Sequence, residues 1–165
     1  LTLNQLESGK DAPVMERFDI VSLIKGVIGS MHIVIEQKEA TVIFEETEPV
    51  YVWADEFKTE EVVTNYTSNA LNHLDGERKV EIKVLHEGDC VKVTVFNTGT
   101  PIPEEDIPNL WNKFYKVDKA RTREYGGSGI GLSIVKAIVE GMNQKYGVCN
   151  YDNGVEFWFT LDCRQ

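Results

Sequence analysis

Four glycines lie within residues 126–131, directly before an apolar stretch, in the segment GGSGIGLSIV. Glycine lets a backbone adopt positive φ and lets another group approach it closely. Backbone N–H groups at the start of a helix form a binding site for an anion. The segment lacks the Gly-Lys-Ser/Thr of a Walker loop, and it does not follow a strand as a dinucleotide-binding loop does. It therefore predicts an anion site that other residues must complete.

Three asparagines share one face of a predicted helix that begins after Asp55. Asn65, Asn69 and Asn72 are spaced i, i+4 and i+7, beside an apolar stripe that runs from Val63 to Leu74. Asparagine is a mediocre helix former, so three on one face are unusual. The pattern indicates either a polar binding face or plain surface polarity, and the residues alone leave both interpretations open.

A basic window leads into the glycines. Its members are Lys113, Lys116, Lys119, Arg121 and Arg123, opposed there only by Asp118. Alone, such a window is as often a solvated surface as a ligand site. Segment 116–127 is also charged and poor in apolar anchors, which predicts a lid that is mobile without ligand.

The composition excludes several classes of function. The chain has 165 residues, which suits one domain, and its net charge of −10 argues against nucleic acid or an anionic membrane as the main partner. Three cysteines without metal-ligand spacing and three scattered histidines make a zinc site unexpected and fit a reduced, cytoplasmic setting. No apolar run approaches the roughly 18 residues that span a bilayer.

The elements that must position these residues alternate between helices and strands. We expect helices over about 20–35, 56–74 and 130–142, a short helix over about 104–116 with Leu110, Trp111 and Phe114 as buried anchors, and strand pairs around the turns near residues 88 and 153. Asp19 and Asp55 are the expected N-caps. This pattern predicts an α+β two-layer sandwich with helices on one face of the sheet, over residues 16–165, after a linker over residues 1–15.

Four segments, in this order, carry a resemblance to a known family: NYTSNALNHL (65–74), FNTGTPI (96–102), LWNKFYK (110–116) and GGSGIGLSIV (126–135). They resemble the N box, first glycine box, F box and second glycine box of the catalytic ATP-binding domain of bacterial two-component sensor histidine kinases, within the GHKL ATPase superfamily. The resemblance covers about residues 16–162. It implies a Bergerat-type mixed sheet, with ATP and Mg²⁺ bound beside the helices.

The resemblance also implies roles for individual residues. Asn65, Asn69 and Lys116 would be catalytic, with Asn69 as the Mg²⁺ ligand, since an amide oxygen suits this hard ion without repelling phosphate. The residues that it implies around the nucleotide are Asn69, Asn72, His73, Asn97, Gly99, Ile102, Tyr115, Lys116, Gly127, Ser128, Gly129, Ile130, Gly131 and Leu132. Phe114 would anchor the lid to the core.

Four positions depart from the family pattern. Asn97 replaces the aspartate that accepts a hydrogen bond from the adenine amino group, but its amide oxygen can still accept that bond. Pro101 replaces the second glycine of that box. Asn72 and His73 replace the usual Lys-Tyr pair. We therefore expect adenine recognition with a changed geometry.

The position of Asn65 separates two branches of the superfamily. Members that hydrolyse ATP with water carry a glutamate there as a general base, which asparagine cannot replace. This favours transfer of the γ-phosphoryl group to a histidine. His32, His73 and His86 lack the sequence setting of an acceptor, so the resemblance implies a histidine on a separate dimerisation domain, with residues 1–15 as a remnant of its last helix, and a response regulator as an indirect partner.

Two further expectations follow from the resemblance. This fragment would be monomeric, as the cytoplasmic domain of a membrane-anchored receptor. The alternative function is a non-catalytic nucleotide-sensing module of a degenerate kinase, which Asn97 and Pro101 favour.

Overall fold

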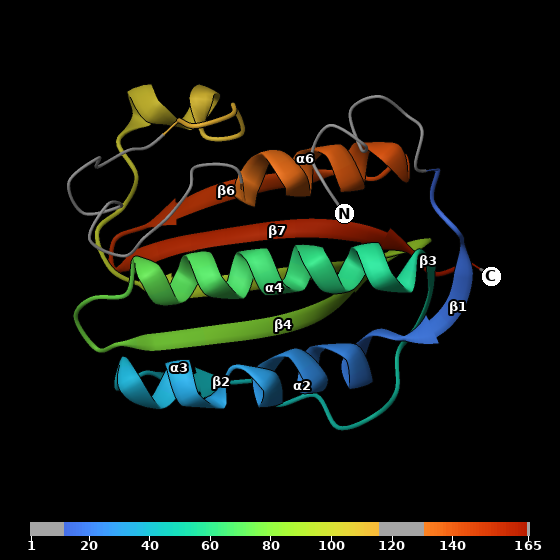
Figure 1. The fold of residues 1–165 in the computed structure, drawn as a ribbon, viewed down its shortest axis with the longest axis horizontal. Coiled ribbons are helices and arrows are strands. Elements are labelled where there is room, and N and C mark those ends of the chain that lie inside the picture. Colours follow the sequence, from blue (N-terminus) through green and yellow to red (C-terminus); the bar gives the residue numbers. More distant parts are fainter. Residues whose placement is uncertain (1–11, 116–130, 165) are drawn as a thin grey trace.

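The computed structural model describes residues 12–115 and 131–164, and Figure 1 shows their fold. In chain order the elements are β1 (Glu16–Asp19), α2 (Ile20–Ser30), α3 (His32–Gln37), β2 (Thr41–Ile43), β3 (Tyr51–Ala54), α4 (Glu56–Asn72), β4 (Lys79–Glu87), β5 (Cys90–Thr98), the 3₁₀ helix η1 (Glu104–Asn109), α6 (Gly131–Gly141), β6 (Tyr146–Tyr151) and β7 (Gly154–Asp162). The expected lid segment 116–127 and most of the linker lie outside the described residues.

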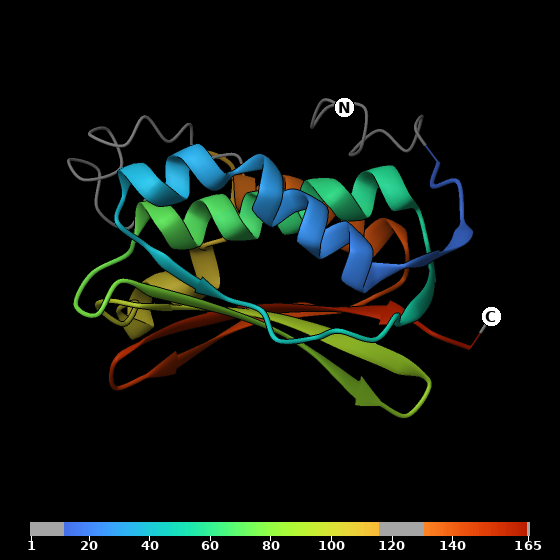
Figure 2. The same ribbon diagram turned by 90° about the horizontal axis from the view of Figure 1, so that it is seen from below.

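The strands form one seven-stranded sheet in the order β1-β3-β7-β5-β4-β2, with β6 paired to β7. β2 runs parallel to β4, whereas the other pairs are antiparallel, so the sheet is mixed. Helices α2, α3, α4 and α6 all cover one face, and the opposite face carries none of the described helices (Figure 2). The prediction of a two-layer α+β sandwich is confirmed.

The C-terminal strand β7 lies in the middle of this sheet. β5 pairs along its whole length, from Cys90 opposite Asp162 to Thr98 opposite Gly154. The other edge of β7 is shared by β6, which pairs with residues 154–159, and by β3, whose Trp53 lies opposite Asp162. β7 therefore holds both halves of the sheet together.

Aspartates begin the two longest helices of the N-terminal half, as predicted. Asp19 accepts a hydrogen bond from the Val21 N–H, and Asp55 accepts one from the Lys58 N–H. The expected single helix over 20–35 is instead two helices that meet at Met31. The Met31 N–H donates to both the Val27 and the Ile28 carbonyl, so the last turn of α2 is tightened toward a 3₁₀ helix. Gly29, a poor helix former, lies in this turn.

The core forms between the helices and the covered face of the sheet. From α4 come Val63, Tyr66, Thr67, Ala70 and Leu71, followed by Leu74, all buried as the apolar stripe predicts. From β7 come Val155, Phe157, Phe159 and Leu161, which are separated by the half-exposed Glu156 and Trp158 and by the buried Thr160. Tyr66 packs against Phe157 and Phe159 with ring centroids 5.4 and 5.9 Å apart. These contacts fix the rotation of α4 about its own axis, so that its asparagine face is turned away from the sheet.

The raised pKa values of two tyrosines, Tyr66 and Tyr146, lead us to expect that the protein is less stable at alkaline pH. The Tyr66 hydroxyl donates to the Trp158 carbonyl at 2.9 Å, and burial, followed by the neighbouring Tyr146, raises its pKa well above the ordinary value. Burial and a hydrogen bond to Glu140 raise the pKa of Tyr146 to about 12. Above a pH of about 10 the unfolded chain releases protons that the folded chain keeps, so the free energy of unfolding falls as the pH rises.

Urea unfolding between pH 8 and pH 11 checks this expectation. At pH 8 the free energy of unfolding of Tyr66→Phe should be about 1 kcal/mol below that of the unchanged chain, because the hydrogen bond is missing. Between pH 8 and pH 11, however, the free energy of unfolding should fall by less in Tyr66→Phe than in the unchanged chain. Equal losses in the two proteins would contradict the role of Tyr66.

The short helix predicted over about 104–116 is confirmed only as the 3₁₀ helix η1, and turns follow it over residues 110–115. Leu110 is buried, and the Trp111 ring packs edge-on against Tyr146 and Phe157. Phe114, however, is 68% exposed and has φ +62°. Its prediction as a buried anchor is wrong, because this left-handed residue reverses the chain and Trp111 already fills the place against the aromatic cluster. Among the described residues, no helix is long and apolar enough to cross a membrane.

Candidate functional site

The predicted N box and the described part of the second glycine box, residues 131–135, meet where α4 packs beside α6 (Figure 1). A Cβ placed on Gly131 would lie 3.1 Å from the Asn65 Oδ1 atom, so the glycine allows the start of α6 to approach this side chain. The Asn65 Nδ2 group donates to the Glu61 carbonyl one turn earlier, at 2.8 Å. Two segments that lie far apart in the sequence are thus brought together, the middle of α4 against the start of α6.

Asn69 and Asn72 follow on the same helix, and both are half-buried. Within the described part of the chain, the Asn69 side chain forms no hydrogen bond, so its amide oxygen is available to a ligand. Asn72 is the last residue of α4, and His73 caps it by donating its N–H to the Asn69 carbonyl at 3.2 Å. The asparagine face therefore ends at the loop that leads to β4.

Asn97 is buried near the end of β5, with 3% of its surface exposed. Its Nδ2 group donates to the Thr98 carbonyl at 3.1 Å and toward the His73 carbonyl at 3.4 Å. With the nitrogen held by these carbonyls, the amide oxygen is the atom left to accept a bond. A carboxylate here would face both carbonyl oxygens, which gives a physical reason for asparagine at this position.

Gly99 continues this junction between β5 and the end of α4. It has φ +154°, and a Cβ on it would lie 2.7 Å from the His73 carbonyl oxygen, so no other residue fits without a backbone shift. The Thr98 hydroxyl donates to the Asp75 carbonyl at 2.8 Å, and the Asp75 N–H donates to the Thr98 carbonyl at 3.0 Å. The first glycine box and the end of the N box therefore form one bonded unit.

Ile102, one of the residues predicted around the nucleotide, is held by a residue that the sequence analysis missed. The Ile102 N–H donates to the Asn150 Oδ1 atom at 3.0 Å, and the Asn150 Nδ2 group donates to the Ile102 carbonyl at 2.8 Å. The Gly99 N–H likewise donates to the Asn153 carbonyl at 3.0 Å. The one available signal was Asn150 itself, because asparagine is disfavoured in a strand such as β6.

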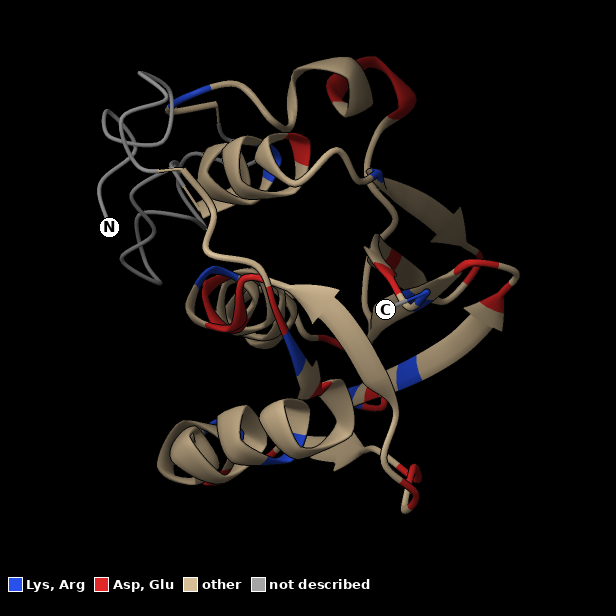
Figure 3. Cartoon of the chain, turned by 90° about the vertical axis from the view of Figure 1, so that its right-hand side faces the viewer, with Lys and Arg blue, Asp and Glu red and all other residues tan. Residues whose placement is uncertain are grey.

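Tyr115 lies at the last described position before the predicted lid. Its hydroxyl donates to the carboxylate of Asp106 in η1, and this bond is the main cause that raises the pKa of Tyr115. η1 has the sequence EEDIPN, and its acidic residues stand out in Figure 3. In this structure the Tyr115 hydroxyl is therefore directed to Asp106.

The remaining predicted site residues divide into two groups. Gly131 begins α6, and Leu132 is half-buried against the core. In the next position the Ser133 hydroxyl is buried and has no hydrogen-bond partner within the described chain. The predicted residues that lie outside the described ranges are Lys116, Gly127, Ser128, Gly129 and Ile130.

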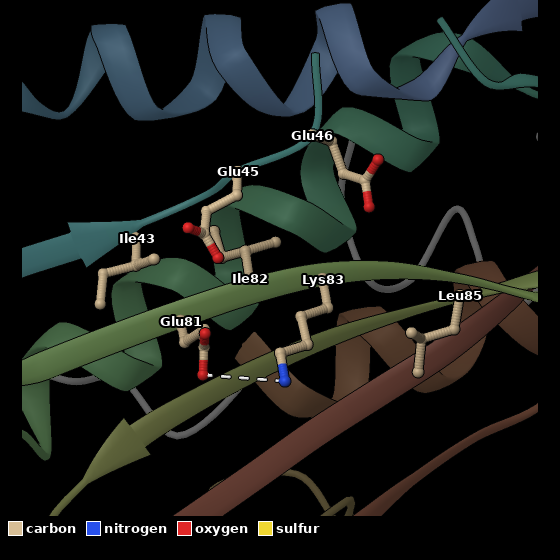
Figure 4. A pocket seen from close by; sticks show the side chains of 7 residues that line it. All are labelled: Ile43, Glu45, Glu46, Glu81, Ile82, Lys83 and Leu85. Atoms are coloured by element: carbon tan, nitrogen blue, oxygen red, sulfur yellow. Dashed lines mark ion pairs between the residues drawn. The ribbon is translucent and has the colours of Figure 1, made fainter. Parts of the chain in front are cut away.

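A shallow pocket of about 170 Å³ lies elsewhere, at the edge of the sheet (Figure 4). Glu45 and Glu46, in the connection after β2, lie on one side of it, and Lys83 pairs with Glu81 on β4 at 3.9 Å. Ile43, Ile82 and Leu85 complete its lining. It contains none of the predicted site residues, so it is separate from the site described above.

Comparison with known proteins now identifies the family. A family profile described as "Histidine kinase-, DNA gyrase B-, and HSP90-like ATPase" matches residues 54–165, which include the asparagine face, both glycine boxes and β7. The chain belongs to this family. The resemblance that the four boxes carry is confirmed, since this histidine kinase-, DNA gyrase B- and HSP90-like ATPase domain is of the type found in sensor histidine kinases.

Curated relatives of this ATPase domain are sensor kinases. The chain is 29% identical over 167 aligned residues to the sensor protein kinase WalK of Staphylococcus saprophyticus, a match that covers 99% of the chain and 27% of the relative. It is 36% identical to the sensor histidine kinase CusS of Escherichia coli K12, a match that covers 67% of the chain and 23% of CusS. The chain thus spans about a quarter of the length of these relatives.

Solved structures agree with this fold. The nucleotide-free catalytic domain of the histidine kinase ThkA superposes with a TM-score of 0.81 at 28% identity, covering 91% of the chain and 96% of that domain. ThkA in complex with the response regulator protein TrrA gives 0.76 at 28% identity, over 90% of the chain and 42% of that structure. The ATPase domain described here therefore has the fold of a histidine-kinase catalytic domain.

Proposed function

We propose that this chain binds Mg²⁺–ATP and transfers the γ-phosphoryl group to a histidine on a separate dimerisation domain in two-component signalling. The observation that carries the proposal is the meeting of Asn65 on α4 with Gly131 at the start of α6. It supports a site in which the amide face of one helix and the N-terminus of another are directed at the same ligand.

Three features support the fit of a magnesium nucleotide to this chain. Gly99 and Gly131 let the backbone lie against the His73 carbonyl and against Asn65, where a Cβ would crowd these groups, so the boxes can converge on one site. The buried Ser133 hydroxyl lacks a partner in the described ranges, close to the start of an 11-residue helix whose N-terminal amides suit phosphate. The neutral amide oxygen of Asn69 suits Mg²⁺.

Each residue has a role that its chemistry allows. Asn69 would hold the metal, and the N–H groups at the start of α6 would donate to the phosphates. Asn97 would accept a bond from the adenine amino group, and Ile102 would pack against the ring. When bound, Mg²⁺–ATP supplies the phosphoryl group, so the chain's own task is to position it and neutralise charge.

The arrangement around Asn65 disfavours hydrolysis by water. Asparagine cannot take a proton at neutral pH, and its Nδ2 group is already bonded to the Glu61 carbonyl. An imidazole acceptor is a nucleophile without such a base. A response regulator would then receive the group from the phosphohistidine, in keeping with the ThkA–TrrA complex among the structures with this fold.

Transfer in trans tests the proposal. The chain alone, incubated with labelled ATP and Mg²⁺, should gain no acid-labile phosphate, because His32, His73 and His86 lack an acceptor setting. Adding the dimerisation domain of the full-length protein should give labelled phosphohistidine on that domain, weakly, because the covalent link between the domains is missing. The same domain with its histidine replaced by alanine is the control.

Two results would contradict the proposal. Labelling of the chain alone at one of its own histidines would show that the acceptor is misassigned. ATP binding without transfer to any acceptor would favour the alternative, a nucleotide-sensing module.

A further inference from the structure

Asn150 on β6 fixes the conformation of the loop that would contact the base. This loop, residues 99–103, contains Pro101 and Pro103, which have no N–H, so within residues 101–103 the Ile102 N–H is the sole backbone donor. The residue before a proline is restricted to extended conformations, so Ile102 directs its own N–H and C=O to the same side. Both of these groups bond to one side chain, that of Asn150.

The chemistry of the amide explains why an asparagine stands at this position. A carboxamide offers an acceptor and a donor in one plane, which matches the N–H and C=O of a single extended residue. The distances are 3.0 Å from the Ile102 N to Oδ1 and 2.8 Å from Nδ2 to the Ile102 O. A carboxylate would keep the first bond but place a negative oxygen against the carbonyl.

A second contact fixes the other end of the loop. The Gly99 N–H donates to the Asn153 carbonyl in the turn between β6 and β7. This end is held backbone to backbone and so tolerates any side chain at residue 153. The Ile102 end depends on a side chain, and Asn150 is therefore where a substitution can move the loop without altering the sheet.

We infer that Asn150 is a positioning residue for adenine recognition, acting through Ile102. The inference rests on the proposed function, because Ile102 contacts a base only if the chain binds ATP. It assigns selectivity for the base to β6, a strand outside the four sequence boxes. Asn150 would affect base selectivity and leave the contacts to the phosphates, which α4 and α6 supply, unchanged.

Calorimetric titration with ATP and with GTP tests the inference. The proteins compared are the unchanged chain, Asn150→Asp, Asn150→Ala and the control Asn143→Ala, and urea unfolding measures the stability of each. Asn143 is exposed after α6 and has φ +59°, a conformation that alanine adopts less readily, so this variant controls for a small loss of stability away from the loop. Asn150→Asp should weaken ATP binding about 10-fold and reduce the preference for ATP over GTP by a similar factor. Asn150→Ala should do the same to a smaller extent, and Asn143→Ala should change neither.

Each other outcome has a definite meaning. ATP binding that is unchanged in Asn150→Asp overturns the inference while the proposed function stands. Equal weakening for ATP and GTP, together with easier unfolding, also overturns it, because it shows a general structural role. If the unchanged chain fails to bind ATP, the proposed function is overturned and the inference with it.

Discussion

Replacing Asn69 with alanine is expected to weaken binding of ATP roughly 10- to 100-fold when Mg²⁺ is present, because a bond to a charged partner contributes roughly 1.5–3 kcal/mol. Asn69 is half-buried on the α4 face that meets α6, and its side chain has no hydrogen bond within the described residues. Its removal therefore breaks no hydrogen bond among the described residues. Titration calorimetry measures the change.

Removing the metal makes this experiment specific. If Asn69 binds Mg²⁺, the unchanged chain and Asn69→Ala should bind ATP with similar affinity in EDTA and should differ only in Mg²⁺. Asn143→Ala, on the surface, should behave as the unchanged chain does under both conditions. A difference that persists in EDTA would mean that Asn69 contacts the nucleotide directly, and no difference in Mg²⁺ would remove it from the site.

Replacing Gly154 with alanine is expected to destabilise the fold by about 3 kcal/mol. A Cβ on Gly154 would lie 2.1 Å from the Asn97 carbonyl oxygen and 2.7 Å from the Phe96 ring. The first of these contacts is with backbone, so β7 and β5 must separate locally. Since the displaced carbonyl belongs to Asn97, the variant should also lose affinity for ATP.

A glycine in open space provides the matched control. Gly26 lies inside α2, and a Cβ on it would meet nothing within 4 Å. Gly26→Ala should stabilise the protein by about 0.5–1 kcal/mol, since alanine favours a helix over glycine. Urea unfolding followed by tryptophan fluorescence measures both variants. An unchanged midpoint for Gly154→Ala would show that the strands separate at little cost.

Sequence patterns predict those parts of the structure that depend on interactions between residues close together in the chain. Asp19 and Asp55 cap helices because their side chains bond to backbone groups two and three residues away, and the stripe around Tyr66 is buried because its period matches a helix. The boxes also indicate that Asn65 and Gly131 share a site. Their actual approach depends on how α4 packs against α6, which no local pattern contains.

Other parts could not be predicted because they depend on distant partners. The bonds between Asn150 and Ile102 join β6 to a loop that precedes η1, and nothing in either segment specifies the other. Phe114 illustrates the opposite error. An aromatic residue after a short helix usually packs inward, but here Trp111 fills the place beside Tyr146 and Phe157.

The central place of β7 has a consequence for synthesis on the ribosome. β3 and β5 leave the exit tunnel early, yet the strand that joins them is made after all the other described elements. The same last hairpin carries Asn150 and Asn153, which hold both ends of the loop over residues 99–103. In a nascent chain that lacks this hairpin, β3 and β5 are not joined into one continuous sheet, and the loop over residues 99–103 is not held in place. Nucleotide affinity should therefore be gained in one late step, after the hairpin emerges.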